Sequence, residues 1–176
     1  RHIYNQQWST FVLFDGYQKS ESVRISENCA LCPVTTQILS TIPGLLTAGF
    51  SRLGPGTRIR PHRGSAPSVL RLHLGLVVPG DCGICVNGSI RQWSEGHCLA
   101  FDDTYLHEAW NSSSRDRVVL LIDVKYDSPL RDELRALIEP RTSEDVARAI
   151  RQQCRFVAIQ LGAKLVKSLP AGWMSR

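Results

Sequence analysis

The sequence has 176 residues, of which 43% are hydrophobic and 21% charged, and its formal net charge is +5. This composition is typical of one compact domain, residues 1–176, and excludes a disordered chain, a collagen-like repeat and a disulfide-dense mini-protein. We expect no nucleic-acid partner, because the 17 Arg residues are interleaved with Asp and Glu and form no basic run. No apolar run approaches the roughly 18 residues of a membrane-spanning helix.

The predicted elements change in character along the chain. The first 44 residues predict a strand at 8–14, a polar loop at 16–28 and a short helix at 35–42, after Pro33. Short β-rich segments separated by Gly, Pro, Asn and Asp turns follow at 47–53, 69–78, 83–86, 89–93, 97–101 and 118–124. Regular short strands with such turns favour a β-sandwich or barrel over an α/β sheet.

The last part of the sequence predicts a helical extension over residues 128–168. Ser128-Pro129 is typical of a helix start and predicts a helix at 130–138, which Pro140 ends. A second helix begins near 142–145, and its apolar residues recur at steps of three and four: Val146, Ile150, Cys154, Val157, Leu161 and Leu165. We interpret this stripe as a packing face against the sheet. A homodimer interface is the alternative.

The six Cys residues allow several interpretations and do not indicate a compartment. Cys29-x-x-Cys32 and Cys82-x-x-Cys85 could form a four-thiolate zinc site. The second pair, however, lies in a short strand between turns. A disulfide between Cys29 and Cys32, or plain buried thiols, is therefore the favoured interpretation.

Several side chains with metal- and anion-binding chemistry lie in the β-rich region. Side chains alternate along a strand, so Arg71 and His73 share one face of the predicted strand at 69–78. That face is either solvent-exposed or the wall of a polar pocket. His62 follows Pro61, and His107 comes forty-five residues later, so two strands of a small barrel could bring both imidazoles to one Fe(II) ion. By spacing alone, however, structural histidines with ordinary hydrogen bonds are the favoured interpretation. Arg117 could hold a carboxylate through two parallel hydrogen bonds.

An ordered set of motifs resembles the aspartyl/asparaginyl β-hydroxylase family over about residues 8–130. The motifs are Pro55-Gly56-Thr57, Pro61-His62-x-Gly64, Leu70-Arg71-Leu72-His73-Leu74-Gly75-Leu76, Trp93-x-Glu95-Gly96, Phe101-Asp102-Asp103, His107-Glu108, Trp110, Arg117 and Asp123-Val124. The resemblance implies a mainly β fold, a double-stranded β-helix (jelly roll, cupin-like) with flanking helices, two of them C-terminal. It also implies dependence on Fe(II) and 2-oxoglutarate.

Carried over by position, the resemblance implies that His62 and His107 are the iron ligands and catalytic residues. Gly64 stands where most related oxygenases have a carboxylate ligand, and it matches the members that use two protein ligands. Arg117 and Ser51 would bind the distal carboxylate of 2-oxoglutarate, although a Ser before a Gly-Pro-Gly turn is often only a turn former. Arg71 and His73 would lie near its iron-chelating end.

The acidic residues and the substrate are less defined by the resemblance. Asp102 and Asp103 are expected to be turn residues or to support the ligands, with an Asp as third ligand the alternative. Family members that act on Asp carry a basic residue where this sequence has Val69. Arg58, Arg60 and Arg63 could meet an anionic substrate, but solvated surface charge is the favoured interpretation.

We therefore expect a 2-oxoglutarate-dependent dioxygenase that uses O₂ to hydroxylate an unactivated carbon of a protein or small-molecule substrate. The β-carbon of an Asp- or Asn-type residue, or a related small substrate, is the favoured target. One alternative is a non-catalytic jelly-roll binding module that retains the metal and 2-oxoglutarate site. Another is a cupin-type metal enzyme that does not use 2-oxoglutarate, which the position of Arg117 disfavours.

Overall fold

The computed structural model describes residues 3–4, 7–17, 22–66 and 68–125. Their elements in chain order are β1 (Ile3–Tyr4), β2 (Trp8–Asp15), α1 (Val23–Leu31), α2 (Pro33–Leu39), β3 (Leu45–Leu53), β4 (Thr57–His62), β5 (Val69–Val77), β6 (Cys82–Val86), β7 (Ser89–Arg91), β8 (Cys98–Asp102), β9 (His107–Asn111) and β10 (Arg117–Lys125). None of the helices in this part of the chain is long and apolar enough to cross a membrane.

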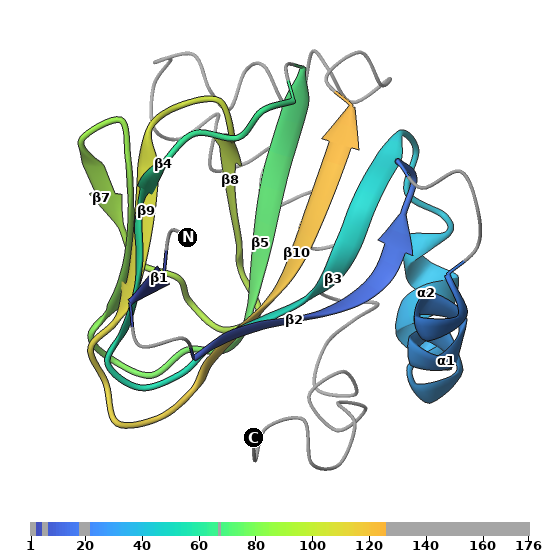
Figure 1. Ribbon diagram of the computed structural model, residues 1–176, viewed down its shortest axis with the longest axis horizontal. Helices are drawn as coiled ribbons and strands as arrows, with labels where there is room; N and C mark the ends of the chain where they lie inside the picture. The colour runs from blue at the N-terminus through green and yellow to red at the C-terminus, as the bar shows by residue number, and fades with distance from the viewer. Residues whose placement is uncertain (1–2, 5–6, 18–21, 67, 126–176) are drawn as a thin grey trace.

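The strands form two five-stranded sheets that face each other (Figure 1). One sheet has the order β1-β4-β9-β6-β7, and the other has the order β2-β3-β10-β5-β8. All pairs are antiparallel. The eight strands from β3 to β10 follow the order of a jelly roll, in which β6 and β7 form a hairpin within one sheet and the other consecutive strands lie in opposite sheets. The predicted mainly β jelly roll is therefore confirmed.

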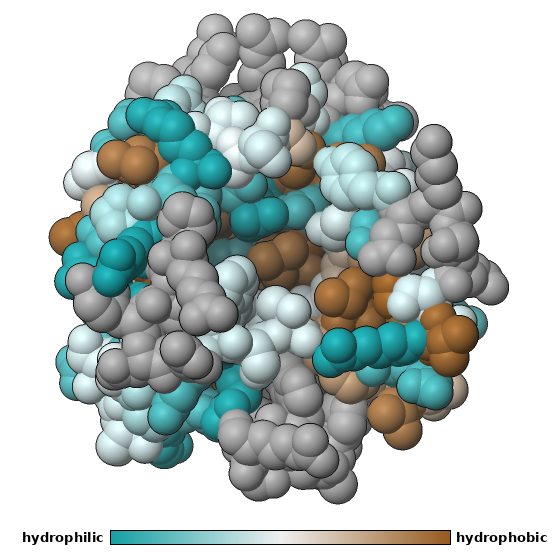
Figure 2. Space-filling model, in the orientation of Figure 1, coloured by the Kyte–Doolittle hydropathy of each residue, from teal (hydrophilic) through white to brown (hydrophobic). Residues whose placement is uncertain are grey.

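Alternation along the strands divides the apolar residues between two cores. The larger cluster includes Phe50, Leu74 and Leu120, with Leu39 from α2 packed among them. The smaller cluster lies between the sheets and joins Ile59 and Ile84 to Trp93. Because successive residues point to opposite faces, the intervening positions of β5, β9 and β10 are left to face the interior between the sheets. Seen along the direction of Figure 1, the molecule is hollowed there, and both hydrophilic and hydrophobic side chains line the hollow (Figure 2).

Most of the predicted strands agree with the structure to within about two residues, but β1 and β9 are missing from the predicted segments. The longer of these two strands is β9, His107–Asn111. The composition of β9 is mixed, but its first, third and fifth residues are buried and the two residues between them are half-buried. β9 pairs with β4 on one side and β6 on the other. Its stability therefore comes from its central position in the sheet rather than from local propensity.

The prediction of a polar loop at 16–28 was wrong, because α1 begins at Val23. The helix is held to β2 by its own polar residues: the Asn28 side-chain amide donates to the carbonyl of Val12, and the Cys29 thiol donates to that of Leu13. The second helix, predicted at 35–42, begins earlier and ends at Leu39. Its last turn closes where the hydroxyls of Ser40 and Thr41 donate to preceding carbonyls.

The predicted C-terminal helices, and with them the predicted dimer interface, lie outside the described residues.

The hairpin between β6 and β7 is closed by a tight turn. Asn87 and Gly88 form its two-residue turn, with φ of 47° and 80°. An Asn-Gly pair adopts such left-handed angles at low cost, and this turn type closes adjacent antiparallel strands tightly. The register of the hairpin is therefore fixed at Val86 and Ser89.

Candidate metal and anion site

β4 and β9 bring His62 and His107 side by side. The two residues are cross-strand partners, and their ring centroids lie 4.2 Å apart. The β4–β9 register shifts between Ile59 and His62, in the segment that contains Pro61. Proline cannot donate a ladder hydrogen bond, so a strand interruption at this point is expected. The predicted ligand pair is thus brought together by strand pairing.

Both imidazoles have the same tautomer, fixed by the backbone. Nδ1 of His62 lies 2.8 Å from the carbonyl oxygen of Arg60, and Nδ1 of His107 lies 2.8 Å from that of Tyr105. A carbonyl can only accept, so each Nδ1 must carry the proton, and the lone pair of each neutral ring lies on Nε2. Metal-binding histidines commonly donate their other nitrogen to a carbonyl in this way. The two rings therefore fit a metal ion bound through Nε2.

Asp103 supplies a carboxylate beside this pair. Its Oδ1 lies 3.3 Å from Nε2 of His107. Burial lowers the pKa of His107, and His62 and Arg71 add to that shift, while the Tyr105 carbonyl and Asp103 oppose it. A neutral imidazole turns its lone pair toward the carboxylate, and two acceptors at this distance are mutually repulsive. A cation at Nε2 would relieve that repulsion.

Gly64 is required by the position of Asp103. A Cβ added at residue 64 would overlap the Asp103 carboxylate, and the Gly64 amide donates to the Asp103 carbonyl at 2.8 Å. The two residues therefore share one space, and only glycine leaves room for the acidic side chain. Among the described residues, no group of three or more His, Cys, Asp or Glu side chains is arranged to hold a metal ion. The histidine pair therefore remains the candidate ligand set in this part of the chain.

Arg71 is bound by two carboxylates. Its guanidinium donates from Nε and Nη2 to Asp123, at 2.8 and 2.7 Å, and from Nη1 to Asp103, at 2.5 Å. Burial acts to lower the pKa of Arg71, but the hydrogen bond to Asp123 and the charges of both carboxylates outweigh it and raise that pKa. Thr47 also donates to Asp123, at 2.9 Å. Arg71 thus holds Asp103 in place next to His107.

Arg117 is the opposite case, a fully buried arginine that has no carboxylate partner among the described residues. It is 1% exposed, and within the described residues its Nη1 donates a 3.4 Å hydrogen bond to the carbonyl of Ser51. Its Cζ lies 4.7 Å from the ring centroid of Trp93, and its Nε has no partner in this part of the chain. Burial lowers the pKa of Arg117 to about 10. A buried, charged and unpaired guanidinium is costly, so this arrangement indicates an anion site.

Ser51 and His73 complete the surroundings of Arg117. The Ser51 hydroxyl accepts a 3.0 Å hydrogen bond from the Trp8 indole, which leaves its own proton available to donate. His73 is 8% exposed, and neither of its ring nitrogens has a partner among the described residues. Burial, and then the charges of Arg117 and Arg71, hold the pKa of His73 well below its ordinary value. His73 is therefore a neutral ring with unsatisfied hydrogen-bonding capacity in the same interior.

The structure thus brings all six predicted site residues to the space between the two sheets. Sequence reasoning left the role of Asp103 open and missed the contacts of Asp123, Trp8 and Trp93. The aspartate at 123 was within a quoted motif, but its pairing with Arg71 depends on the β5–β10 register. The zinc interpretation of the Cys pairs gains no support in the described residues, where no three His, Cys, Asp or Glu side chains gather around a possible metal position.

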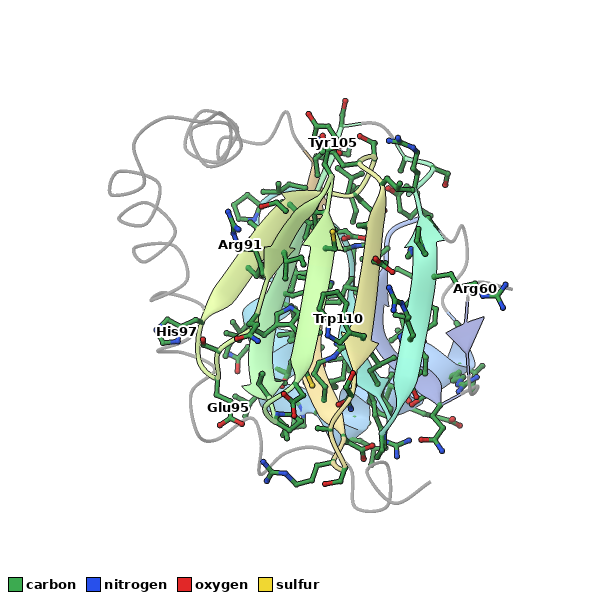
Figure 3. The ribbon with its side chains drawn as sticks, turned by 90° about the vertical axis from the view of Figure 1, so that its left-hand side faces the viewer. Arg60, Arg91, Glu95, His97, Tyr105 and Trp110 are labelled. Carbon is green, nitrogen blue, oxygen red and sulfur yellow. The ribbon has the colours of Figure 1, made fainter. Side chains whose placement is uncertain are left out.

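Arg58 and Arg60 of β4, and Arg63 just after it, are exposed. Arg58 pairs with Glu108 at 2.6 Å, and Arg63 donates to the carbonyl of Thr104 at 3.0 Å. Figure 3 shows Arg60 projecting away from the molecule at the edge of its sheet. These contacts agree with the interpretation of solvated surface charge.

Known proteins resemble the chain over the same region that holds the site. The family model described as aspartyl/asparaginyl beta-hydroxylase matches residues 1–126. An ornithine lipid ester-linked acyl 2-hydroxylase of Rhizobium tropici is 43% identical over 132 residues, which is 73% of this chain and 44% of that protein. Aspartate beta-hydroxylase domain-containing protein 2 of Xenopus tropicalis is 36% identical, over 74% of this chain and 36% of that protein.

Human aspartyl/asparaginyl beta-hydroxylase is 33% identical, over 74% of this chain and 17% of that protein. The chain therefore spans less than half the length of these curated relatives. Among solved structures, the Cupin_2 domain of an XRE family transcriptional regulator from Enterobacter cloacae matches with a TM-score of 0.46 and 15% identity, over 68% of this chain and 97% of that chain. The family model and the sequence relatives agree, and the chain belongs to the aspartyl/asparaginyl β-hydroxylase family.

Proposed function

We propose that this protein is an Fe(II)- and 2-oxoglutarate-dependent dioxygenase that hydroxylates an unactivated carbon. The observation that carries the proposal is the buried, carboxylate-free Arg117 in the same interior as the His62–His107 pair. One part of this interior fits a small dianion and the other fits a divalent metal. 2-Oxoglutarate has a carboxylate for the first and a chelating 2-oxo acid for the second.

The two histidines would hold Fe(II) through Nε2. When bound, Fe(II) supplies the activation of O₂ that breaking an unactivated C–H bond requires. The chain orients the two ligands through the Arg60 and Tyr105 carbonyls, and Asp103 adds a negative charge beside them. Arg71 keeps that carboxylate in place through its hydrogen bond to Asp103.

The remaining residues would bind the cosubstrate. Arg117 would pair with the distal carboxylate of 2-oxoglutarate, and the Ser51 hydroxyl would donate to the same group. Charge-assisted hydrogen bonds of this kind contribute roughly 1.5–3 kcal/mol each, because the buried guanidinium gains the partner that it lacks. His73 would hydrogen-bond the chelating end, and Arg71 would lie near that end while bound to Asp103 and Asp123.

The overall reaction balances without another reductant. One molecule of O₂ supplies one oxygen atom to the hydroxylated product and one to succinate, while 2-oxoglutarate loses CO₂ and provides two electrons. The favoured target from the sequence is the β-carbon of an Asp- or Asn-type residue. The names of the relatives do not select a target, since they include an acyl hydroxylase as well as aspartyl/asparaginyl hydroxylases.

The test begins with the anaerobic protein, Fe(II) and 2-oxoglutarate. We expect a metal-to-ligand charge-transfer absorption band, followed by succinate formation when air is admitted. A band without succinate, with or without candidate substrates, would favour the non-catalytic binding module. Succinate formation by a protein that shows no charge-transfer band would contradict the proposed site. A protein that binds neither Fe(II) nor 2-oxoglutarate would also contradict it.

A further inference from the structure

Trp93 lies in the loop between β7 and β8, and its indole is buried in the interior between the two sheets. The residue is 4% exposed and packs in the smaller apolar cluster. Its Nε1–H finds no acceptor in the part of the chain that the structure describes. Buried tryptophans usually donate this hydrogen bond, because a buried donor without an acceptor loses its hydration and gains nothing in return. The N–H of Trp93 is therefore available to a ligand.

The loop that carries Trp93 is held by backbone hydrogen bonds to β5. The Gly75 amide donates to the carbonyl of His97 at 3.0 Å, and the Gly96 amide donates to the carbonyl of Gly75 at 2.9 Å. A Cβ at Gly75 would overlap the carbonyl oxygen of Ser94, so the strand and the loop are in close contact. Backbone contacts thus fix the position of the indole. A ligand that accepts from Trp93 would meet a donor already in place, which lowers the entropy cost of binding.

The neighbours of Trp93 are residues of the candidate anion site. Cζ of Arg117 lies 4.7 Å from the ring centroid of Trp93, and the ring centroid of His73 lies 6.0 Å from it. Nε of Arg117 and both ring nitrogens of His73 are likewise buried without partners among the described residues. Four of the six buried side-chain atoms of this kind in the described chain thus belong to these three neighbouring side chains. Native proteins leave few such atoms, so their concentration in one interior points to a polar ligand.

We propose that Trp93 is a cosubstrate-binding residue, whose Nε1–H donates to the distal carboxylate of 2-oxoglutarate beside Arg117. A carboxylate offers about four acceptor sites. The Arg117 guanidinium would occupy two of them and the Ser51 hydroxyl a third, which leaves one for the indole. Arg117 also lies over the face of the indole ring, and a cation–π contact of this kind stabilises the charged guanidinium before the anion binds. This inference rests on the proposed function and adds a residue to its anion site.

The test compares Trp93→Phe with Trp110→Phe. Phenylalanine at residue 93 keeps an aromatic ring beside Arg117 and removes the N–H. Trp110 is the matched control: its neighbour Ala109 belongs to the smaller apolar cluster, so Trp110 lies on the outer face of the sheet, against Gly83 (Figure 3). Titration of the anaerobic Fe(II) protein with 2-oxoglutarate, followed by the charge-transfer band, gives the dissociation constant. Trp93→Phe should raise it roughly ten- to hundredfold, the loss expected for one hydrogen bond to a charged group, and Trp110→Phe should leave it unchanged.

A second ligand, 2-oxopentanoate, separates the lost hydrogen bond from a change in packing. It chelates a metal through the same 2-oxo acid group but carries a methyl group in place of the distal carboxylate. A packing defect at residue 93 would weaken the binding of both ligands equally, whereas loss of the N–H should weaken only that of 2-oxoglutarate. Equal weakening of the two ligands, or unchanged binding of 2-oxoglutarate by Trp93→Phe, would overturn the proposal.

A measurement on the wild-type protein does not depend on the folding of Trp93→Phe. In protein that contains isotope-labelled tryptophan and diamagnetic Zn(II), NMR should show the indole proton of Trp93 shifting downfield when 2-oxoglutarate binds, and that of Trp110 staying in place. Phenylalanine variants of the other tryptophans, Trp8, Trp110 and Trp173, assign the Trp93 signal by elimination. An unmoved Trp93 signal at saturating 2-oxoglutarate would refute the indole as a donor, whereas a wild-type protein without the charge-transfer band would refute the proposed function itself.

Discussion

The carboxylate of Asp103 occupies the space into which a side chain at residue 64 would project. A Cβ on Gly64 would overlap it, and the backbone of the two residues is joined by a 2.8 Å hydrogen bond. The acidic group next to the histidine pair thus comes from the chain segment before His107 rather than from the segment after His62. Because the carboxylate of Asp103 fills the space beside residue 64, the site requires glycine at that position.

Gly64→Ala should therefore destabilise the protein. The added methyl group must displace Asp103, and overpacking of this kind costs about 1–3 kcal/mol of unfolding free energy. Urea unfolding of the metal-free protein measures the effect. Gly80→Ala is the control, because nothing lies within 4 Å of a Cβ at that position. Equal stability of the two variants would show that Asp103 is not confined by residue 64.

His107→Ala should abolish both the charge-transfer band and succinate formation, because one of two protein ligands is lost. The neighbouring Glu108→Gln serves as control: Glu108 pairs with Arg58 instead of facing His62. We expect it to retain the band, with a stability change below about 1 kcal/mol, as for an exposed ion pair. Normal 2-oxoglutarate turnover by His107→Ala would refute the ligand assignment.

Arg117→Met should have opposite effects on binding and on stability. Loss of the guanidinium should weaken 2-oxoglutarate binding by roughly ten- to hundredfold, the loss expected for a charged hydrogen bond worth 1.5–3 kcal/mol. The ligand-free variant should be at least as stable as the wild type, because an unpaired buried charge is replaced by an apolar side chain. Thermal unfolding with and without 2-oxoglutarate measures both effects. A large loss of stability in the ligand-free variant would mean that Arg117 has a structural partner.

Arg71→Met should behave differently from Arg117→Met, although both replace an inward-facing arginine. Removal of Arg71 leaves Asp103 and Asp123 without their shared cation, and breaking a buried ion pair in this way costs roughly 3 kcal/mol or more. Partial exposure of Arg71 will reduce that figure. Denaturant unfolding of the two methionine variants, in the absence of metal and cosubstrate, compares them directly. Equal stabilities would contradict the distinction between a paired and an unpaired guanidinium.

His73→Phe should flatten the pH dependence of stability below pH 6.5. The pKa of native His73 is held well below its ordinary value, so the unfolded chain binds a proton near pH 6.5 that the native state does not bind. Stability contributed by neutral His73 is therefore present above pH 6.5 and is lost as the pH falls below it, by up to about 1.4 kcal/mol per pH unit. Phenylalanine keeps an aromatic ring between Trp93 and Phe101.

Urea unfolding of both metal-free proteins at pH 7, 6 and 5 measures the difference. The wild type should lose more stability than His73→Phe over this range. Parallel losses would indicate that His73 is protonated in the native protein. The remaining dependence in the variant should include His107, whose pKa is also lowered by burial.

The sequence alone determined the alternating strands, their turns and the residue types of the site. Period-two alternation from Val69 to Val77 predicted that Arg71 and His73 share a face, and the motif around His62 and His107 identified the histidine pair. These are local features, because strand alternation and turn chemistry act over a few residues. The α1 helix and β9 were missed for the complementary reason: their stability depends on contacts with β2, β4 and β6, which the local sequence does not encode.

Only the tertiary structure decided which charges are paired. From the sequence, Arg71 and Arg117 are both candidate anion-binding residues. The register of β5 against β10 places Asp123 opposite Arg71, and the missing side chain at Gly64 leaves room for Asp103. Arg117, in contrast, is buried over Trp93 and has no carboxylate partner among the described residues. Pairing depends on distances of a few ångströms between strands far apart in sequence, and burial sets how strongly those distances count. For that reason the overall charge of +5 does not point to an anion site, whereas one buried arginine without a carboxylate among the described residues does.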